Sequence, residues 1–413
     1  MKAVVFTLGC KVNECESESL IAGLKSRGYE VSDKLEKADL YIINTCAVTL
    51  EAEKKSRQTA SRIKKLNPDA KVVFTGCAAE NNYKAFADKS SAYLITGVFN
   101  KNNILSALEK SGVMIAEKSA EYEELPAPVS LKTRAFIKVQ DGCDGFCTYC
   151  IIPHLRGRSR SRNPEKVKSE IQSLNPAEAI ITGINLSDYR HGETELSGLM
   201  ERLKGVECRI RLGSLEARVI DDRLLTALKS LNNFAPHFHL SLQSGSDNVL
   251  KKMNRKYTRK EFIEKVALIR KYFPLAGITT DIIVGFPTET EKDFCETLSI
   301  IDEVKFSDIH PFSFSPRRGT PAYKMPDLPP EVKKERLNRL LRAKARVKAE
   351  FAALMREKTA DFLPEEVKDG YTEGYSKNYL RLYVKGEIPV GKIVKVKVGG
   401  AFKDGATAEI ING

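Results

Sequence analysis

Residues 141–162 read DGCDGFCTYCIIPHLRGRSRSR, with Cys143, Cys147 and Cys150 in a CxxxCxxC pattern. A structural zinc site is normally closed by four Cys or His ligands at paired spacing. His154 lies near this motif, but a Cys3His finger would leave the surrounding strand pattern unexplained. Fe–S clusters also use cysteine thiolates, usually four for each 4Fe–4S cluster. Three thiolates on such a cluster would leave one iron open to a small molecule.

Strand-like runs surround this motif at regular spacing. The run RAFIKVQ precedes it, and AEAIITG, CRIRLGS, HFHLSLQ, GITTDIIVGF and SDIHPFSF follow, each with a helix-compatible stretch after it. About six βα units of this kind predict a full or partial (βα) barrel over residues 132–330, with its chemistry at the C-terminal ends of the strands. The cysteine loop comes directly after the first of these strands.

Three earlier strand-like runs, within residues 1–115, each stop at a cysteine. AVVFTLG ends at Cys10, DLYIINT at Cys46 and KVVFTG at Cys77, with charge-rich segments of helical length between them. This alternation predicts an α/β domain with a parallel sheet, whose strand ends meet at one ligand-binding edge. Most free cysteines are simply small buried hydrophobic residues. Three at the same topological position nevertheless favour a shared metal site.

Composition limits the compartment and the partners. A chain of 413 residues favours two or three units. The net charge of +13 points to a polyanionic partner, although an excess of basic residues often serves only solubility. The N-terminus lacks a signal-peptide pattern, and runs such as AEAIITGI are shorter than the roughly 18 residues of a membrane span. We therefore expect a cytoplasmic protein without membrane contact, whose cysteines serve metals or catalysis rather than disulfides.

The remaining segments predict a linker, a helix and a small barrel. Residues 116–131 are rich in Pro, Ser and Glu and predict a linker. Residues 331–358 carry ten Lys or Arg against four acids, with an apolar stripe that predicts an amphipathic helix with a basic outer face. Residues 359–413 alternate polar and apolar positions, as strands of a small β-barrel do. Tyrosines beside Lys377 and Arg381 suit RNA contact, although they would also pack together.

These motifs resemble those of radical S-adenosylmethionine enzymes, which carry CxxxCxxC with an aromatic residue before the last cysteine, here Tyr149. The pieces TLGCKVNE, NTCAVT, TGCAAE, RIRLGSLEAR and DIIVGFPTETEKDF are similar to those of methylthiotransferases, over nearly the whole chain. TLGCKVN, KKSRQ and LQSGSDNVLKKMNRKYT most resemble the branch acting on N6-threonylcarbamoyladenosine beside the tRNA anticodon. The C-terminal tail resembles the TRAM domain, an RNA-binding barrel.

The resemblance implies two 4Fe–4S clusters and S-adenosylmethionine. The radical cluster and the auxiliary cluster would be held, respectively, by Cys143, Cys147 and Cys150 and by Cys10, Cys46 and Cys77. Together they would replace the C2 hydrogen of adenosine 37 with a methylthio group, giving 2-methylthio-N6-threonylcarbamoyladenosine. Implied partners are tRNA, a sulfur donor and a low-potential electron donor, either flavodoxin or ferredoxin. The remaining cysteines, Cys15, Cys208 and Cys295, we expect to be structural.

Several positions at strand ends are expected to contact S-adenosylmethionine. Glycine permits close approach of the backbone to a ligand, and polar side chains at strand ends would face it. Two of these positions have ordinary alternatives, because Tyr149 would also pack in the loop and Gly-Phe-Pro is a common turn. The expected contacts are Tyr149, Gly183, Asn185, Glu216, Gln243 and Gly285.

The alternating arginines after the cysteines are expected to bind RNA phosphates. Every second side chain of an extended segment points the same way, so Arg156, Arg158, Arg160 and Arg162 would form one basic row. A solvated charge run is the alternative.

Two classes of function stay open at this point. One is a radical enzyme that methylthiolates tRNA, with isopentenyladenosine tRNA or a ribosomal protein aspartate as alternative substrates. The other is a non-catalytic, metal-stabilised RNA-binding protein. The second would explain the charge and the barrel tail, but not two cysteine triads that leave iron positions open.

Overall fold

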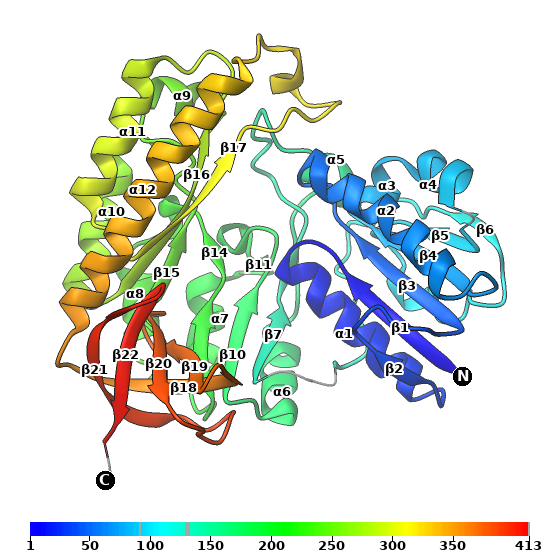
Figure 1. Ribbon diagram of the computed structural model, residues 1–413, viewed down its shortest axis with the longest axis horizontal. Coiled ribbons are helices and arrows are strands. Elements are labelled where there is room, and N and C mark those ends of the chain that lie inside the picture. The colour runs from blue at the N-terminus through cyan, green and yellow to red at the C-terminus, as the bar shows by residue number, and fades with distance from the viewer. Residues whose placement is uncertain (91, 129–132, 412–413) are drawn as a thin grey trace.

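The computed structural model describes residues 1–90, 92–128 and 133–411, and it consists of three connected units (Figure 1). These are a parallel α/β domain, an open (βα) barrel and a closed β-barrel. Residues 129–131 of the predicted linker lie outside the described residues. No helix in the described ranges is long and apolar enough to cross a membrane.

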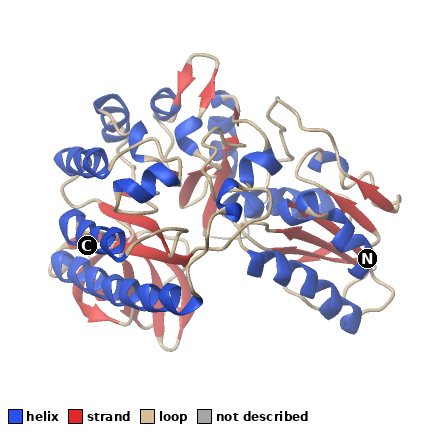
Figure 2. Ribbon diagram, turned by 90° about the horizontal axis from the view of Figure 1, so that it is seen from above, coloured by secondary structure: helices blue, strands red, loops and turns tan. Residues whose placement is uncertain are grey.

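The N-terminal domain is a six-stranded parallel sheet in the order β2-β1-β3-β4-β5-β6. Alternate residues of each strand face opposite sides, so Val4 and Tyr41 pack with α2 and α4, while Val5 and Ile42 pack with α1. Figure 2 shows helices on both faces of this sheet. The elements are β1 (Lys2–Thr7), α1 (Lys11–Lys25), β2 (Glu30–Ser32), β3 (Leu40–Thr45), α2 (Leu50–Leu66), β4 (Lys71–Gly76), α3 (Cys77–Asn81), α4 (Tyr83–Ser90), β5 (Leu94–Thr96) and β6 (Gly112–Met114).

The central unit is an open barrel of parallel strands, each followed by a helix. Its sheets, β13-β10-β7 and β14-β15-β16-β17, join where Gly213 separates β13 from β14. The main strands are β7 (Arg134–Lys138), β10 (Glu178–Thr182), β13 (Arg209–Leu212), β14 (Ser214–Leu215), β15 (His237–Leu240), β16 (Gly277–Val284) and β17 (Asp308–Ser313). The helices are α5 (Ile152–Arg156), α6 (Pro164–Leu174), α7 (Leu196–Arg202), α8 (Asp222–Lys229), α9 (Asp247–Lys252), α10 (Arg259–Tyr272), α11 (Glu291–Val304) and α12 (Pro330–Met355). Short strand pairs are β8 (Gln140–Asp141) with β9 (Arg160–Ser161), and β11 (Arg190–His191) with β12 (Thr194–Glu195).

The C-terminal unit is a closed five-stranded barrel in the order β18-β19-β20-β22-β21. Its strands are β18 (Thr359–Lys368), β19 (Tyr371–Ser376), β20 (Arg381–Lys385), β21 (Val394–Phe402) and β22 (Gly405–Ile410). The barrel packs against the beginnings of the central strands: Asn378 Nδ2 donates to the Leu275 carbonyl at 2.9 Å, and the Tyr379 ring stacks on His237 at 4.3 Å. It therefore lies at the end of the central strands opposite the cysteine loop (Figure 1).

Helix α12 joins the central unit to the C-terminal barrel rather than standing apart from both. Leu340 and Val347 belong to the central core, whereas Phe351 and Met355 belong to the core of the C-terminal barrel. The basic amphipathic helix predicted at residues 331–358 thus covers part of the central unit before it enters the third.

The predicted linker is held against the central unit where the structure describes it. The Tyr122 hydroxyl donates to the Lys138 carbonyl at 2.8 Å, and the Glu124 carboxylate accepts from Arg162 Nε at 2.8 Å. Nearby, Cys15 on α1 donates its thiol to the Phe136 carbonyl at 3.3 Å. These contacts fix the N-terminal domain beside β7.

Candidate functional site

The first cysteine triad lies where three adjacent strands of the N-terminal sheet end. Register pairs Thr7 with Asn44 and Asn44 with Thr75, so the strands preceding the three cysteines finish side by side. Gly9 has φ +116°, and a Cβ there would lie 2.9 Å from Cys46 Cβ, so the chain entering Cys10 passes directly against Cys46. The structure therefore brings the ends carrying Cys10, Cys46 and Cys77 to one edge.

The second triad lies on the loop between β8 and α5. The Gly145 N–H donates to Cys143 Sγ at 3.3 Å, and the Cys150 N–H donates to the Cys147 carbonyl at 3.0 Å. A Cβ at Gly145 would lie 3.3 Å from Cys143 Sγ and 3.7 Å from Cys147 Sγ, so a side chain there would crowd the sulfurs. The loop wraps closely around its own thiols.

Burial keeps several of these thiols protonated in the absence of a metal. It raises the pKa of Cys143, Cys150 and Cys46 to about 12 and also raises the pKa of Cys77. A metal binds the thiolate and releases the proton. Thiols with such pKa values do not act as free thiolate nucleophiles at neutral pH.

Polar N–H groups point at sulfur in both triads. Arg255 Nη1 donates to Cys147 Sγ at 3.3 Å, and Arg156 Nε donates to Cys77 Sγ at 3.3 Å. Hydrogen bonds to sulfur are one of the means by which proteins tune Fe–S clusters. Among the described residues, no three His, Cys, Asp or Glu side chains could hold a metal ion together. Each thiolate of a 4Fe–4S cluster binds a different iron, and the donor sets suit that kind of group.

Three of the residues expected at S-adenosylmethionine adjoin the second triad. Asn185 Nδ2 lies 3.9 Å from Cys143 Sγ, and Glu216 Oε1 lies 3.1 Å from Arg255 Nη1. Tyr149 packs edge-on against Phe286 with a centroid distance of 6.4 Å, and burial raises the pKa of its hydroxyl. Asn185, Glu216 and Arg255 thus gather polar groups beside the loop, while Tyr149 also takes part in its packing.

Gly183 and Gly285 are required by the packing of the chain itself. A Cβ at Gly183 would lie 2.8 Å from Gln140 Oε1, and one at Gly285, where φ is +70°, would lie 2.5 Å from Lys333 Cγ. Gln243 is 9% exposed and has φ 69°, and its N–H and carbonyl bond to the backbone of β16. Packing and backbone bonds account for these three positions, and their contact with S-adenosylmethionine stays a prediction.

The prediction of one exposed arginine row is wrong. Arg156 is 0% and Arg160 7% exposed, and Arg162 bonds to Glu124 and Glu170. Residues 152–156 form a helix that ends at Gly157 with φ 72°, and β9 is two residues long, so side chains do not alternate as in an extended strand. Arg158 alone of the four keeps a mostly exposed side chain, 3.2 Å from Asp144.

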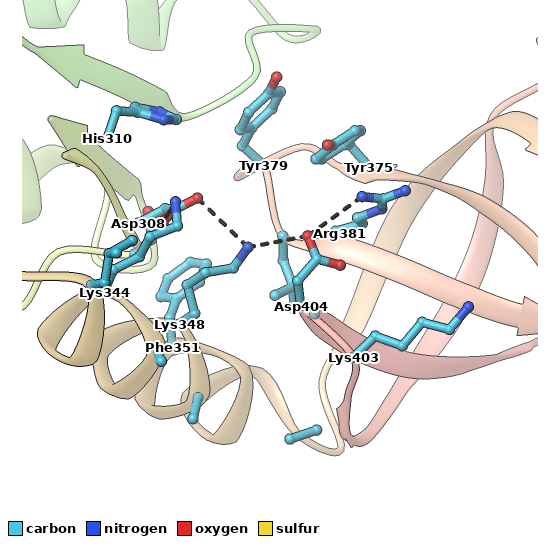
Figure 3. Close-up of a pocket in the computed structure, with 17 residues that line it drawn as sticks. Asp308, His310, Lys344, Lys348, Phe351, Tyr375, Tyr379, Arg381, Lys403 and Asp404 are labelled. Atoms are coloured by element: carbon cyan, nitrogen blue, oxygen red, sulfur yellow. Dashed lines mark hydrogen bonds and ion pairs between the residues drawn. The ribbon is translucent and has the colours of Figure 1, made fainter. Parts of the chain in front are cut away.

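The C-terminal candidates lie far along the chain from the cysteines and are ion-paired. Lys377 Nζ lies 3.2 Å from Asp361. Arg381 lines a cavity of about 510 Å³ between α12, the start of β17 and the C-terminal barrel, and Figure 3 shows this arrangement. Cations and aromatic rings share the cavity wall with two carboxylates; the main charged and aromatic side chains are Lys344, Lys348, Lys403, Tyr375, Tyr379, Asp308 and Asp404.

Sequence reasoning missed Arg255, which the fold carries to the cysteine loop from 108 positions away. It lies in the stretch MNRKYT, which the family resemblance singled out as a motif without giving it a role. Sequence reasoning also missed Asn13 and Glu16 of α1, whose contacts with Arg156 span the two domains.

Comparison with known proteins matches two separate parts of the chain to family models. Residues 137–301 match the model of the Radical SAM superfamily, and residues 2–97 match that of Uncharacterized protein family UPF0004. The chain is 38% identical over its whole length to the threonylcarbamoyladenosine tRNA methylthiotransferase of Bacillus subtilis (strain 168), covering 97% of that protein. It is 36% identical, again over its whole length, to the tRNA-2-methylthio-N(6)-dimethylallyladenosine synthase of Geobacillus kaustophilus, covering 82% of it.

Solved structures show likeness of fold. The radical S-adenosylmethionine methyltransferase TsrM from Kitasatospora setae superposes with a TM-score of 0.58 at 14% identity, covering 90% of this chain and 80% of that one. The full-length relatives and the two matched models together place the chain in the radical SAM superfamily and, within it, in the tRNA methylthiotransferase family.

Proposed function

We propose that this enzyme converts N6-threonylcarbamoyladenosine at position 37 of tRNA to its 2-methylthio derivative. The proposal rests on sequence identity of 37–38%, over 96% or more of the chain, to relatives named threonylcarbamoyladenosine tRNA methylthiotransferase. These include the proteins of Bacillus subtilis and Aquifex aeolicus. Two cysteine triads, on separate domains that meet at α1 and β7, supply the donor sets that the reaction needs.

We assign one cluster to each triad. Cys143, Cys147 and Cys150 would hold the radical cluster, and Cys10, Cys46 and Cys77 the auxiliary one. When bound, the clusters and S-adenosylmethionine supply the radical that removes the C2 hydrogen and the methylthio group that replaces it. The chain itself holds the groups in place and limits water access, because Cys46 and Cys77 are buried and the cysteines of the second triad are partly buried.

Arg255 has a positioning role beside the second triad. It bonds to Cys147 Sγ, to Glu216 and, at 3.0 Å, to the Ser241 carbonyl, so it ties the loop to the ends of β14 and β15. Asn185 bonds at 2.9 Å to Asp188, whose carboxylate accepts from the Asp144 N–H at 3.3 Å, so this pair holds the other side of the loop. Arg255 and Asn185 hold the loop so that the side of the triad without a cysteine faces the strand ends, where we place S-adenosylmethionine.

The inner face of the central strands favours a polar adenosine substituent. Phe238, Ile282 and Ile309 belong to the core, so their neighbours His239, Asp281 and His310 face the other side. His239 Nε2 lies 3.2 Å from Asp281 Oδ2, and the rings of His239 and His310 are 5.5 Å apart. A threonylcarbamoyl group carries a carboxylate and a hydroxyl, which match these polar side chains, whereas a dimethylallyl group is apolar and offers them no hydrogen-bonding group.

Lys11 supplies a cation at the same place. Burial raises the pKa of Asp281, but the bond from His239 and the charges of His239, His310 and Lys11 outweigh it and lower that pKa. Lys11 is exposed, follows Cys10 directly and lies 6.0 Å from the centroid of Phe136 on β7. We propose that it binds the carboxylate of the threonylcarbamoyl group.

Replacing Lys11 by methionine is expected to lower kcat/KM for tRNA bearing the threonylcarbamoyl group by about ten- to hundredfold. The reason is removal of a charge-assisted hydrogen bond, worth about 1.5–3 kcal/mol. Lys25→Met, at the far end of the same helix, is the matched control and should retain full activity. Unchanged kcat/KM in Lys11→Met protein with normal iron content would exclude this role for the lysine.

The direct test of the proposed function uses reconstituted enzyme and two tRNA substrates. One carries N6-threonylcarbamoyladenosine and the other N6-isopentenyladenosine at position 37. Mass spectrometry of the digested nucleosides should show the 2-methylthio product from the first. Product from the second alone would favour the alternative suggested by the dimethylallyladenosine relatives.

For tRNA binding we propose Arg158, Lys377 and Arg381. Arg158 is exposed and contacts the cysteine loop, because it pairs with Asp144 and lies 4.7 Å from the Phe146 ring. Arg381 lines the cavity of Figure 3, where cations and tyrosine rings suit phosphates and stacked bases. Arg156, Arg160 and Arg162 are left out of this proposal because their side chains are buried or nearly so.

Arg158→Gln is expected to weaken tRNA binding and to flatten its salt dependence. Because binding to a phosphate releases condensed counterions, removing one such cation should reduce the slope of log K against log salt by about 0.7–0.9. Lys260→Gln on α10 removes an equally accessible cation far along the chain and serves as the control. Equal slopes for the Arg158→Gln and wild-type proteins would show that Arg158 is a surface residue that does not bind a tRNA phosphate.

The proposed chemistry also requires electrons and sulfur from other molecules. We propose a low-potential flavodoxin or ferredoxin as the electron donor and a separate sulfur donor. Both are expectations from the family.

A further inference from the structure

The two cysteine triads are connected by a buried ionic network centred on Arg156. This side chain is 0% exposed and makes five hydrogen bonds, one for each guanidinium N–H. Nη1 bonds to Glu16 Oε1 and to Asp141 Oδ1, each at 2.9 Å. Nη2 bonds to Asn13 Oδ1 at 2.8 Å and to Glu16 Oε2 at 3.3 Å.

The fifth hydrogen bond reaches the first triad. Arg156 Nε donates to Cys77 Sγ at 3.3 Å, although Arg156 itself belongs to the helix that follows the second triad. Its partner Asp141 stands two residues before Cys143, and Asn13 stands three residues after Cys10. One rigid planar group therefore contacts Cys77 and Asn13 at the first triad and Asp141 just before the second.

The network carries more positive than negative charge. In the described part of the chain, the ion pairs of this network join four cations, Lys101, Lys138, Arg156 and Arg160, to two carboxylates, Glu16 and Asp141. Buried charge without a counter-charge is costly. Burial lowers the pKa of Lys101 although Glu16 opposes it, whereas Asp141 and Glu16 outweigh burial and raise the pKa of both Lys138 and Arg156.

An anionic acceptor at Cys77 would offset this excess. A neutral thiol is a weak acceptor, whereas a metal-bound thiolate accepts a charge-assisted bond. Resting on the cluster assignment of the proposed function, we propose that Arg156 is a positioning residue that fixes the separation of the two triads and raises the reduction potential of the cluster held by Cys77. A positive N–H donor at a ligand sulfur stabilises the reduced, more negative state.

The test is a potentiometric titration followed by electron paramagnetic resonance. It uses full-length protein carrying Cys143→Ala, Cys147→Ala and Cys150→Ala, so that the auxiliary cluster is read alone. Adding Arg156→Met should shift its potential to more negative values. Arg160→Met removes the same charge from the same network, but Arg160 bonds to Asp141 and backbone carbonyls rather than to Cys77, so its shift should be distinctly smaller.

Equal potentials in the Arg156→Met and parent proteins, or equal shifts in Arg156→Met and Arg160→Met, would overturn the proposal. If Arg156→Met protein assembles no cluster, Arg156→Gln takes its place: it removes the charge but keeps a polar side chain, and a potential equal to that of the parent overturns the proposal. A purely structural arginine would lower thermal stability without changing the potential. Iron content of about four per chain in the parent protein tests the cluster assignment separately, because it does not depend on Arg156.

A second readout follows the coupling of the two sites in the holoenzyme. Because Arg156 fixes the triads relative to each other, Arg156→Met enzyme with both clusters should form several-fold less methylthio product per 5′-deoxyadenosine. Arg156→Lys should restore part of that ratio. An unchanged ratio in Arg156→Met enzyme would remove the positioning role.

Discussion

Proteins carrying Cys143→Ala, Cys147→Ala or Cys150→Ala are expected to form no 5′-deoxyadenosine from S-adenosylmethionine. Each substitution removes one of the three thiolates assigned to the radical cluster, and the loop offers no fourth cysteine to replace it. Cleavage should fall to background, while the N-terminal triad still assembles its cluster, so iron should drop from about eight to about four per chain. Chromatography of the cofactor products and iron analysis measure both effects.

Cys295→Ala provides the matched control for these variants. Cys295 is exposed on α11, and its thiol contacts Glu291 at 3.7 Å, away from both triads. This variant should keep wild-type cleavage and iron content. Wild-type 5′-deoxyadenosine from any variant of the second triad would refute its assignment as the radical cluster.

The second large effect is expected from Cys10→Ala and Cys77→Ala. Both enzymes should still cleave S-adenosylmethionine but should form no methylthio product, because the two triads lie on separate domains and would hold separate clusters. Cys77→Ala also leaves Arg156 Nε without its partner, whereas Cys10 is exposed and its thiol bonds to Asn13 at 3.8 Å. The Cys10 variant therefore tests ligation with less disturbance of the fold.

Cys15→Ala is the control for the first triad. Cys15 lies close to Cys10 in sequence, but its thiol donates to the Phe136 carbonyl, away from that edge of the sheet. It should retain product formation. Methylthio product from the Cys10 or Cys77 variant would exclude the auxiliary cluster from the reaction.

The strands of both α/β units were predictable from sequence because their apolar runs are short. Each run either stops at a cysteine or is followed by a helix-compatible stretch. All six runs predicted for the central unit form strands, and the three strands that stop at cysteines lie next to one another in the sheet. The short strands β2, β5 and β6 were not predicted. They are three residues each, too short to show a period of their own.

The surroundings of the triads were less predictable because their contacts are distant in sequence. The alternation of Arg156 to Arg162 suggested one exposed face, but helix α5 and the turn at Gly157 break that pattern. Glu16 meets Arg156 across 140 positions, and Arg255 meets Cys147 across 108. Local periodicity carries no information about such pairs, so a buried counter-ion and a surface phosphate ligand look the same in sequence.

The most direct measurement of the central claim is mass spectrometry of tRNA nucleosides from a strain that lacks this gene. The account predicts disappearance of 2-methylthio-N6-threonylcarbamoyladenosine and accumulation of N6-threonylcarbamoyladenosine, with both reversed by the wild-type gene but not by the Cys147→Ala or Cys10→Ala versions. Unchanged levels of the methylthio nucleoside, or disappearance of 2-methylthio-N6-isopentenyladenosine instead, would contradict it.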